Sequence, residues 1–323
     1  MPRIAATARV LYLVYIGLSL AQTFLLYVGG LSLFEALTHT FATMGTGGFS
    51  TKNLSVAAFN NLYLEVIIIC FMFLAGTNFS LHYQAFMGKP RSFWENSEFR
   101  FYTFVVVSAT LLITLNLWWF YYDDILISLR HAAFQVVSIV TTTGFISADY
   151  ESWPVFSQSI LLLLMFLGGC AGSTGGAIKQ VRILVLLKYG WRELYRLLHP
   201  RAVIPLRLGN TKLFPILWSP RLPALSFLYG VIFVLSVLLL TAFNIDLVSS
   251  ISAVAATLGN IGHWAGRRRP WETTMEGCRM AVKICIKFFN AMRAPRDLYG
   301  FSVIDPGLSA GTWIFLPAVH CQF

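Results

Sequence analysis

Three short loops contain the residues of this 323-residue chain whose types and spacing are best suited to chemistry. Backbone carbonyl and hydroxyl oxygens in such loops can replace the water around a dehydrated cation. Glycine adopts backbone angles that other residues resist, and it leaves no side chain in the path of an ion. The loops therefore predict coordination of a permeant ion. They are Thr46-Gly47-Gly48, Thr142-Thr143-Gly144 and Asn260-Ile261-Gly262, hereafter the filter loops.

The composition places these loops in a membrane protein. Hydrophobic residues make up 57% of the chain and charged residues only 12%, whereas a soluble domain carries about a quarter charged residues. The net charge of +10 arises from basic residues that fall between apolar spans, which is typical of cytoplasmic loops and does not require a nucleic-acid partner. The five cysteines show no close C-x-x-C pair, so neither a disulfide framework nor a metal site is indicated.

Each filter loop follows a short apolar half-helix, and longer apolar spans flank the pair. A bilayer tolerates non-helical backbone only where protein or a water-filled path surrounds it, and the carboxyl end of a half-helix favours a cation. This repeated arrangement is an internal repeat. The predicted half-helices are Ser32–Thr43, Leu129–Val140 and Ser249–Thr257, and the predicted spans are Val10–Gly29, Leu62–Leu81, Phe101–Trp119, Phe156–Leu187 and Leu222–Phe243.

The charges between the spans predict an orientation. The stretches Lys89–Arg100 and Lys188–Arg221 are basic, whereas Asp123–Asp124 and Asp149–Glu151 are acidic. The two sets alternate with the span count, so the basic side is expected in the cytoplasm and the filter loops near the other face.

A second motif, Gly168–Gly176, interrupts the predicted span Phe156–Leu187; it is called the glycine-rich segment below. It lacks the G-x-x-x-x-G-K-[ST] spacing of a phosphate-binding loop. We expect it to break the helix and to form a movable constriction beneath the filter loops, facing the same cavity as Gly76-Thr77-Asn78. The residues predicted to form this gate are Gly168, Gly169, Gly172, Ser173, Thr174, Gly175, Gly176 and Lys179.

Two other classes of function remain as alternatives. The six histidines are scattered and form no metal-binding or catalytic pattern, and few acids lie within the spans, so an integral membrane enzyme is disfavoured. The small residues of the loops could instead serve close helix packing in a pore-less structural subunit, although three loops in the same relative position favour a pore.

Five stretches carry a resemblance to the Trk/Ktr/HKT superfamily of potassium transporters, and within it to the bacterial TrkH-type uptake subunits. They are Ser32–Thr51, Val137–Pro154, Gly168–Lys188, Arg192–Asn210 and Ala255–Gly262.

The resemblance implies an all-α, polytopic protein of the bacterial inner membrane, with four pore units around a pseudo-fourfold axis and K⁺ as the transported ion. Gly48, Gly144 and Gly262 match the filter glycines of the second, third and fourth units, and the glycine-rich segment matches an intramembrane gating loop. The family also implies a homodimer, a cytosolic nucleotide-binding ring of the TrkA type and no organic cofactor. The predicted division is 1–88 and 101–187 for two units, 222–262 for the start of another, 89–100 and 188–221 for cytoplasmic loops, and 263–323 for an aberrant tail.

The resemblance fails at both ends. Met1 falls just before the family's second unit, so the first unit has no counterpart in this sequence. After Gly262 the chain departs from the family ending. When each codon of the tail is read from its second base, however, the shifted frame permits that ending, and Arg293–Gly307 then permits the family's Gly-Arg-Leu-Glu motif. We therefore interpret the tail as a frameshift. Because a closed ring needs four loops, we expect little transport by this polypeptide alone.

Overall fold

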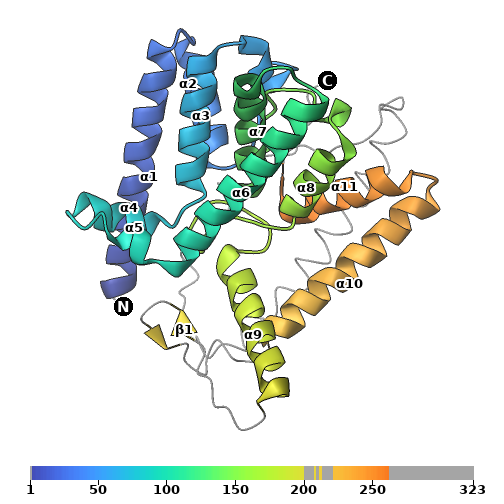
Figure 1. Ribbon diagram of the computed structural model, residues 1–323. Helices are drawn as coiled ribbons and strands as arrows, with labels where there is room; N and C mark the ends of the chain where they lie inside the picture. Colours follow the sequence, from blue (N-terminus) through green and yellow to red (C-terminus); the bar gives the residue numbers. More distant parts are fainter. Residues whose placement is uncertain (1, 200–206, 209–210, 213–220, 262–323) are drawn as a thin grey trace.

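The computed structural model describes residues 2–199, 207–208, 211–212 and 221–261, and this part of the chain is predominantly helical (Figure 1). Gly262 and the predicted tail 263–323 lie outside the described residues. The elements are α1 Pro2–Val28, α2 Leu33–Met44, η1 Ser55–Phe59, α3 Leu62–Ala75, α4 Phe79–Phe86, α5 Ser92–Glu95, α6 Ser97–Phe120, α7 Ile125–Val140, η2 Tyr150–Ser152, α8 Val155–Leu164, α9 Gln180–Leu198, β1 Arg207–Leu208, β2 Thr211–Lys212, α10 Arg221–Ala242 and α11 Leu247–Gly259.

Two of the described helices are long and apolar enough to cross a membrane alone. They are Arg9–Val28 within α1 and Ser97–Phe120, which is α6. A bilayer core of about 30 Å requires about 20 residues at 1.5 Å per residue. Both helices agree with the predicted spans Val10–Gly29 and Phe101–Trp119. Of the predicted span Leu222–Phe243, α10 covers nearly the whole length.

The predicted span Leu62–Leu81 is wrong as a single continuous helix. Helix α3 ends at Ala75, and α4 restarts at Phe79 after a bend of 101°. The Asn78 side chain accepts a hydrogen bond from the Ser80 backbone N–H (2.8 Å) and so caps the new helix. An N-cap residue begins a helix in a fresh direction, which explains why the chain turns here although its apolar character continues.

The three half-helices exist as predicted. They are α2, α7 and α11, with 12, 16 and 13 residues, so each is shorter than the roughly 20 residues that a span requires. Each begins with a capping side chain. Ser32 caps α2 in a capping box with Glu35, Asp124 caps α7, and Asp246 caps α11. Caps at these positions satisfy the first backbone N–H groups, and each helix then runs inward to a filter loop.

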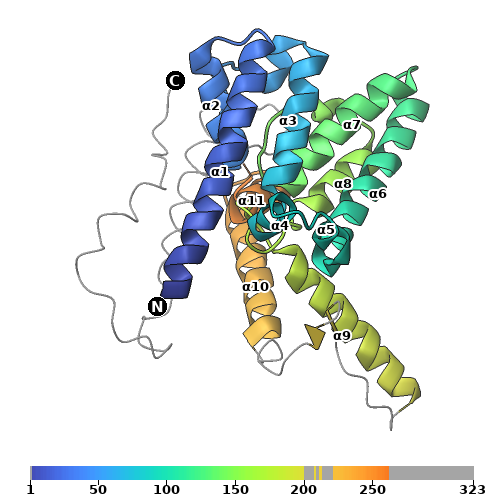
Figure 2. The ribbon, with the colours of Figure 1, turned by 90° about the vertical axis from the view of Figure 1, so that its left-hand side faces the viewer.

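The long apolar run Phe156–Leu187 is broken, as its glycines predicted. Helix α8 ends at Leu164 and α9 begins at Gln180. The chain between them loops round, so that Leu167 pairs in parallel with Ile178 and the Gly168 N–H donates to the Ile178 carbonyl (2.9 Å). Helix α9 then projects away from the other helices (Figure 2) and continues to Leu198. The predicted cytoplasmic loop 188–221 therefore starts inside a helix, which is a correction.

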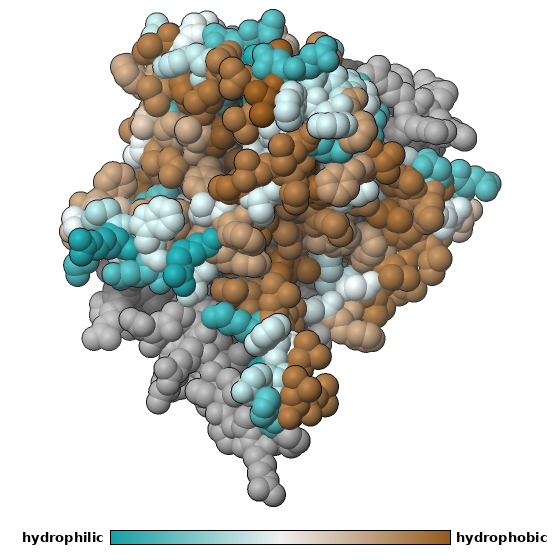
Figure 3. All heavy atoms as spheres, in the orientation of Figure 1, coloured by the Kyte–Doolittle hydropathy of each residue, from teal (hydrophilic) through white to brown (hydrophobic). Residues whose placement is uncertain are grey.

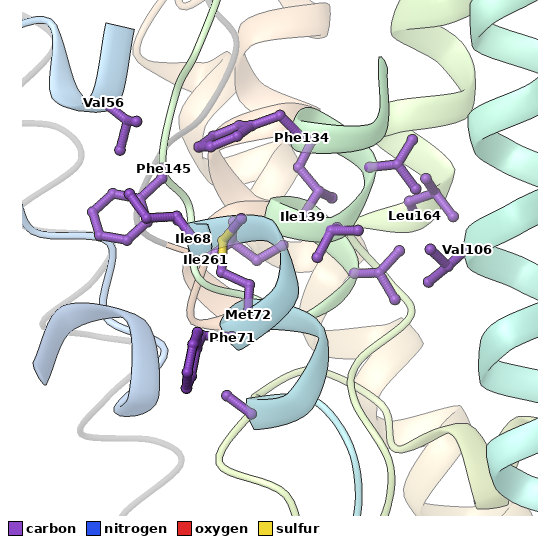
Figure 4. Close-up of a cluster of buried hydrophobic side chains, with 14 of the residues drawn as sticks. Val56, Ile68, Phe71, Met72, Val106, Phe134, Ile139, Phe145, Leu164 and Ile261 are labelled. Atoms are coloured by element: carbon purple, nitrogen blue, oxygen red, sulfur yellow. The ribbon is translucent and has the colours of Figure 1, made fainter. Parts of the chain in front are cut away.

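The apolar core lies between the helices that carry the filter loops. It includes Ile68 and Met72 of α3, Val106 of α6 and Phe134 and Ile139 of α7 (Figure 4). Phe145, which follows the second filter loop, and Ile261 of the third are buried in the same core. The loops are therefore anchored from behind by their neighbouring side chains.

The ends of the molecule differ in polarity. Figure 3 shows a band of apolar side chains across the middle, with hydrophilic residues above it and beside α4 and α5. The N-terminus, α4, α5 and α9 lie toward one end in Figure 1, and the turn between α1 and α2 lies at the other. The basic segments thus share one end, in agreement with the predicted charge alternation.

Candidate ion-conducting site

The three filter loops share one backbone geometry. In each, the N–H of the first loop residue bonds to the carbonyl three residues earlier, and the next N–H bonds to the carbonyl five residues earlier. This pair of bonds is the Schellman ending of a helix. The bonds are Thr46 to Thr43 (3.1 Å) and Gly47 to Ala42 (2.8 Å), Thr142 to Ile139 (2.9 Å) and Thr143 to Ser138 (2.9 Å), and Asn260 to Thr257 (3.3 Å) and Ile261 to Ala256 (2.8 Å).

The first residue of each loop has left-handed backbone angles. The φ values are 50° at Thr46, 59° at Thr142 and 56° at Asn260. Asparagine tolerates this region, but a β-branched residue there is a genuine outlier, at a cost on the order of 1–3 kcal/mol. The sequence analysis selected these residues for oxygen atoms that could bind an ion, and it missed that their backbone forms the left-handed turn that ends each half-helix. The only available signal was their shared position, two residues before Gly48, Gly144 and Gly262.

The first two filter loops meet backbone to backbone. Gly48 and Gly144 have φ values of +67° and +84°, and a Cβ atom added to Gly48 would overlap the Thr143 carbonyl oxygen. Among the described residues, no hydrogen-bond donor approaches the carbonyl oxygens of Thr142, Thr143 or Gly144. Within that part of the chain these carbonyl oxygens accept no hydrogen bond, and the Thr143 oxygen lies against Gly48. The glycine of the third loop, Gly262, lies outside the described residues.

The threonine hydroxyls of the loops are used inside the protein. Thr141 donates to the Val137 carbonyl (2.8 Å), and its hydroxyl lies 2.8 Å from that of Thr143. Thr46 donates to the Gly45 and Thr174 carbonyls at 2.8 and 3.1 Å. The sequence analysis expected hydroxyl and carbonyl oxygens of the loops to serve as ion ligands. The Thr46 and Thr141 hydroxyls donate to backbone carbonyls here, which braces the loop backbone.

The glycine-rich segment docks against all three half-helix ends. The Thr174 carbonyl accepts from Thr46, and the Gly176 N–H donates to the Thr142 hydroxyl (2.6 Å). Next to the segment, the Ala177 N–H donates to the Gly259 carbonyl at the end of α11 (2.9 Å). The predicted gate residues and filter loops are therefore brought together.

The break between α3 and α4 supports the glycine-rich segment from another side. The Cys170 N–H donates to the Gly76 carbonyl (2.9 Å), the Phe79 N–H donates to the Gly172 carbonyl (3.2 Å), and the Thr174 hydroxyl donates to the Ala75 carbonyl (3.3 Å). Gly76-Thr77-Asn78, expected to share a cavity with the segment, lies directly against it.

Two charged side chains bind the backbone around the segment. The Lys179 ammonium donates to the Ser173 carbonyl (3.3 Å), the Ser173 hydroxyl (3.4 Å) and the Gly175 carbonyl. Glu98, at the start of α6, accepts from the backbone N–H groups of Ala171 (2.6 Å) and Val181 (3.1 Å). Sequence reasoning predicted Lys179 as part of the gate and missed Glu98, whose signal was an acid at the entrance of an apolar span.

A partly buried ion pair joins α7 to α3. Arg130 of α7 contacts Glu65 of α3 through both carboxylate oxygens, at 2.6 and 2.7 Å, and Glu65 is 1% exposed. Bidentate pairing fixes both direction and distance. The pair therefore holds the half-helix of the second filter loop against α3, and sequence reasoning missed it because the partners are far apart in the chain.

Comparisons with known proteins show the family to which this chain is similar. Residues 1–282 match the model of the TrkH family, described as cation transport proteins. The chain is 39% identical over 271 residues to the Trk system potassium uptake protein TrkH of Salmonella typhimurium and 38% identical to that of Escherichia coli K12, covering 82% of this chain and 55% of each relative. The crystal structure of the potassium transporter TrkH from Vibrio parahaemolyticus matches with a TM-score of 0.78 and 38% identity, over 83% of this chain and 58% of that one. The chain thus spans about half the length of the curated relatives that it matches.

Proposed function

This chain belongs to the TrkH family of cation transport proteins, and on that premise we propose that it contributes three filter loops to a K⁺-conducting pore. Its family is one of transporters rather than enzymes, as the sequence predicted, and the chain is a membrane protein. The proposed ion ligands are the backbone oxygens of Thr46, Gly47, Gly48, Thr142, Thr143, Gly144, Asn260, Ile261 and Gly262.

One observation carries the proposal: the carboxyl ends of α2, α7 and α11 meet around one segment, and each ends in the same left-handed turn. Helix carboxyl ends carry partial negative charge that favours a cation. Carbonyl oxygens in the loops then substitute for the ion's water. A pore-less structural subunit would need close packing, but not the same left-handed turn at three helix ends.

The glycine-rich segment is the proposed gate. Its contacts to Thr46 and Thr142 hold it against the filter loops on the side from which α9 departs, so it obstructs the path of an ion leaving them. Release of these few hydrogen bonds would open that path. Transport would then depend on a local rearrangement and not on motion of the whole bundle.

The surroundings of the pore form part of the same proposal. The protein crosses the bacterial inner membrane several times, with the end that holds α4, α5 and the basic part of α9 facing the cytoplasm. A TrkA-type nucleotide-binding ring and a second copy of the subunit are the proposed partners, together with membrane lipid. The proposed pore units follow the division at residues 1–88, 101–187 and 222–262.

Growth of a K⁺-uptake-deficient bacterium on low K⁺ tests the function. The chain is expressed alone, or together with the part of the Vibrio relative that the match does not cover. We expect rescue and ⁸⁶Rb⁺ uptake in the second arm, since the family's ring needs four loops, and loss of both with Gly144→Ser. Absence of growth and uptake in both arms, with the chain detected in the membrane, would overturn the proposal.

A further inference from the structure

The charged groups nearest the glycine-rich segment bind peptide groups and not each other. Glu98 is 5% exposed, and one of its oxygens accepts from both the Ala171 and Val181 N–H groups. These two donors lie on either side of the segment's second half. Hydrogen bonds to a charged acceptor contribute roughly twice as much as neutral ones. A single carboxylate thus joins the segment to the first turn of α9.

Lys179 occupies a position where its charge opposes the helix. It is the N-cap residue of α9, and a cation near a helix amino terminus is disfavoured by the helix dipole. Its ammonium instead turns back to three oxygens of Ser173 and Gly175. Stabilisation of α9 therefore does not explain this lysine, whereas retention of the segment does.

The two charges bind opposite ends of peptide groups. The negative Glu98 binds the N–H groups of Ala171 and Val181, and the positive Lys179 binds the carbonyls of Ser173 and Gly175, so both charges hold the same short stretch of backbone. No ion pair joins Glu98 to Lys179 among the residues that the structure describes. In surroundings of low polarity both interactions are stronger than in water, and the opposite signs keep the net charge near zero.

We propose that Glu98 and Lys179 form a two-sided clasp that positions the glycine-rich segment under the filter loops. Both are positioning residues, because neither touches the proposed ion path ligands. The clasp rests on the proposed function of this segment as a gate, and it adds the residues that keep the gate closed. Opening then requires release of the bond from Ala171 to Glu98 and of the Lys179 bonds to Ser173 and Gly175, in addition to the contacts with Thr46 and Thr142.

Hydrogen exchange of the purified full chain in lipid nanodiscs tests the clasp without any transport. The readout is exchange of peptides covering residues 165–181, with peptides of α6 as the measure of global folding. Glu98→Gln and Lys179→Met should each speed exchange of the segment by about tenfold or more, because a hydrogen bond to a charged group is lost or weakened. Lys179→Arg keeps a cationic donor and should restore most of the protection. Glu95→Gln and Lys89→Met, both at exposed positions, are the matched controls and should change nothing.

Charge reversal distinguishes the clasp from an ordinary ion pair. In the double variant Glu98→Lys with Lys179→Glu, each new charge meets the wrong end of the peptides, so the segment should exchange at least as fast as in either single variant. Recovery of protection in that double variant would overturn the clasp, as would unchanged exchange in both single variants. If the reversed variant fails to fold, shown by fast exchange in α6, the single variants and Lys179→Arg decide. Failure of ion uptake alone would contradict the proposed function and leave the clasp standing.

Discussion

The chain contains two broken inner helices, and they are broken in different ways. The first break, between α3 and α4, takes only residues 76–78 and produces a single bend of 101°. The second, between α8 and α9, takes residues 165–179 and forms a loop whose two ends pair in parallel. In both cases one α-helix, α3 or α8, separates the filter loop from the break that follows it. The same position in the repeat therefore has two different structures.

The contacts around the glycines show what the two breaks do. A Cβ atom added to Gly76 would meet the Tyr102 hydroxyl (2.6 Å) and a methyl group of Thr141 (2.8 Å), which are side-chain atoms. At Gly168 and Gly176 an added Cβ would overlap backbone carbonyls. The first break is therefore packed by side chains, whereas the second is packed backbone to backbone. We infer that the first break supports the glycine-rich segment of the second.

The largest effect is expected from Gly176→Ala in the second break. Its methyl group would overlap the Gly259 carbonyl, which also accepts the Ala177 N–H. Overpacking costs about 1–3 kcal/mol, and the lost hydrogen bond adds about 1 kcal/mol. We expect a marked fall in the apparent melting temperature in detergent and faster hydrogen exchange at residues 165–179.

Gly190→Ala is the matched control for this substitution. Gly190 lies within α9, and an added Cβ would meet no atom within 4 Å. Alanine in a helix interior is favoured over glycine by about 1 kcal/mol, so the melting temperature should stay or rise. Equal behaviour of the two variants would refute the idea that the second break is packed by its backbone.

The sequence predicted the position of the second break and of the three half-helices that lead to the filter loops. Glycine clusters in apolar runs and polar residues after short apolar stretches are local signals, so Gly168–Gly176 and the half-helices were found from spacing alone. The half-helix ends agree with the structure within a few residues, which is the usual scatter of helix boundaries. The mapping of these residues to ion ligands remains a prediction.

What the sequence did not predict depends on contacts between distant residues. The bend at Asn78 was missed because an apolar sequence continues through it, and only the capping bond marks the restart. Glu65 with Arg130, and Glu98 with Ala171, each join parts of the chain that have no common local pattern. The left-handed angles of Thr46 and Thr142 contradict residue preference, and such local conflicts gather at functional sites.

A smaller and rescuable effect is expected from Gly76→Ala in the first break. The new methyl group crowds the Tyr102 hydroxyl, at a cost of about 1–2 kcal/mol. Tyr102→Phe removes that hydroxyl and with it a weak 3.3 Å bond to the Phe73 carbonyl. In a double-mutant cycle on melting temperature, the pair should be more stable than the sum of the single effects.

Such rescue separates the two breaks. Side-chain truncation can relieve a clash with Tyr102, but no truncation can relieve a clash with the Gly259 carbonyl. A fully additive cycle for Gly76 and Tyr102 would mean that the first break is also held by its backbone, and the contrast between the breaks would be lost.

The smallest effect is expected at Asn78, which caps α4 and lies against Gly172 of the glycine-rich segment. Asn78→Ala removes the cap and should cost about 1 kcal/mol, while Asn78→Ser keeps a capping oxygen and should cost less. If the first break is a support, the alanine variant will also speed hydrogen exchange around Gly172, although the substitution lies in another helix pair. Faster exchange confined to α4 would instead mean that the cap serves only its own helix, and that the support comes from the backbone contacts of Ala75, Gly76 and Phe79.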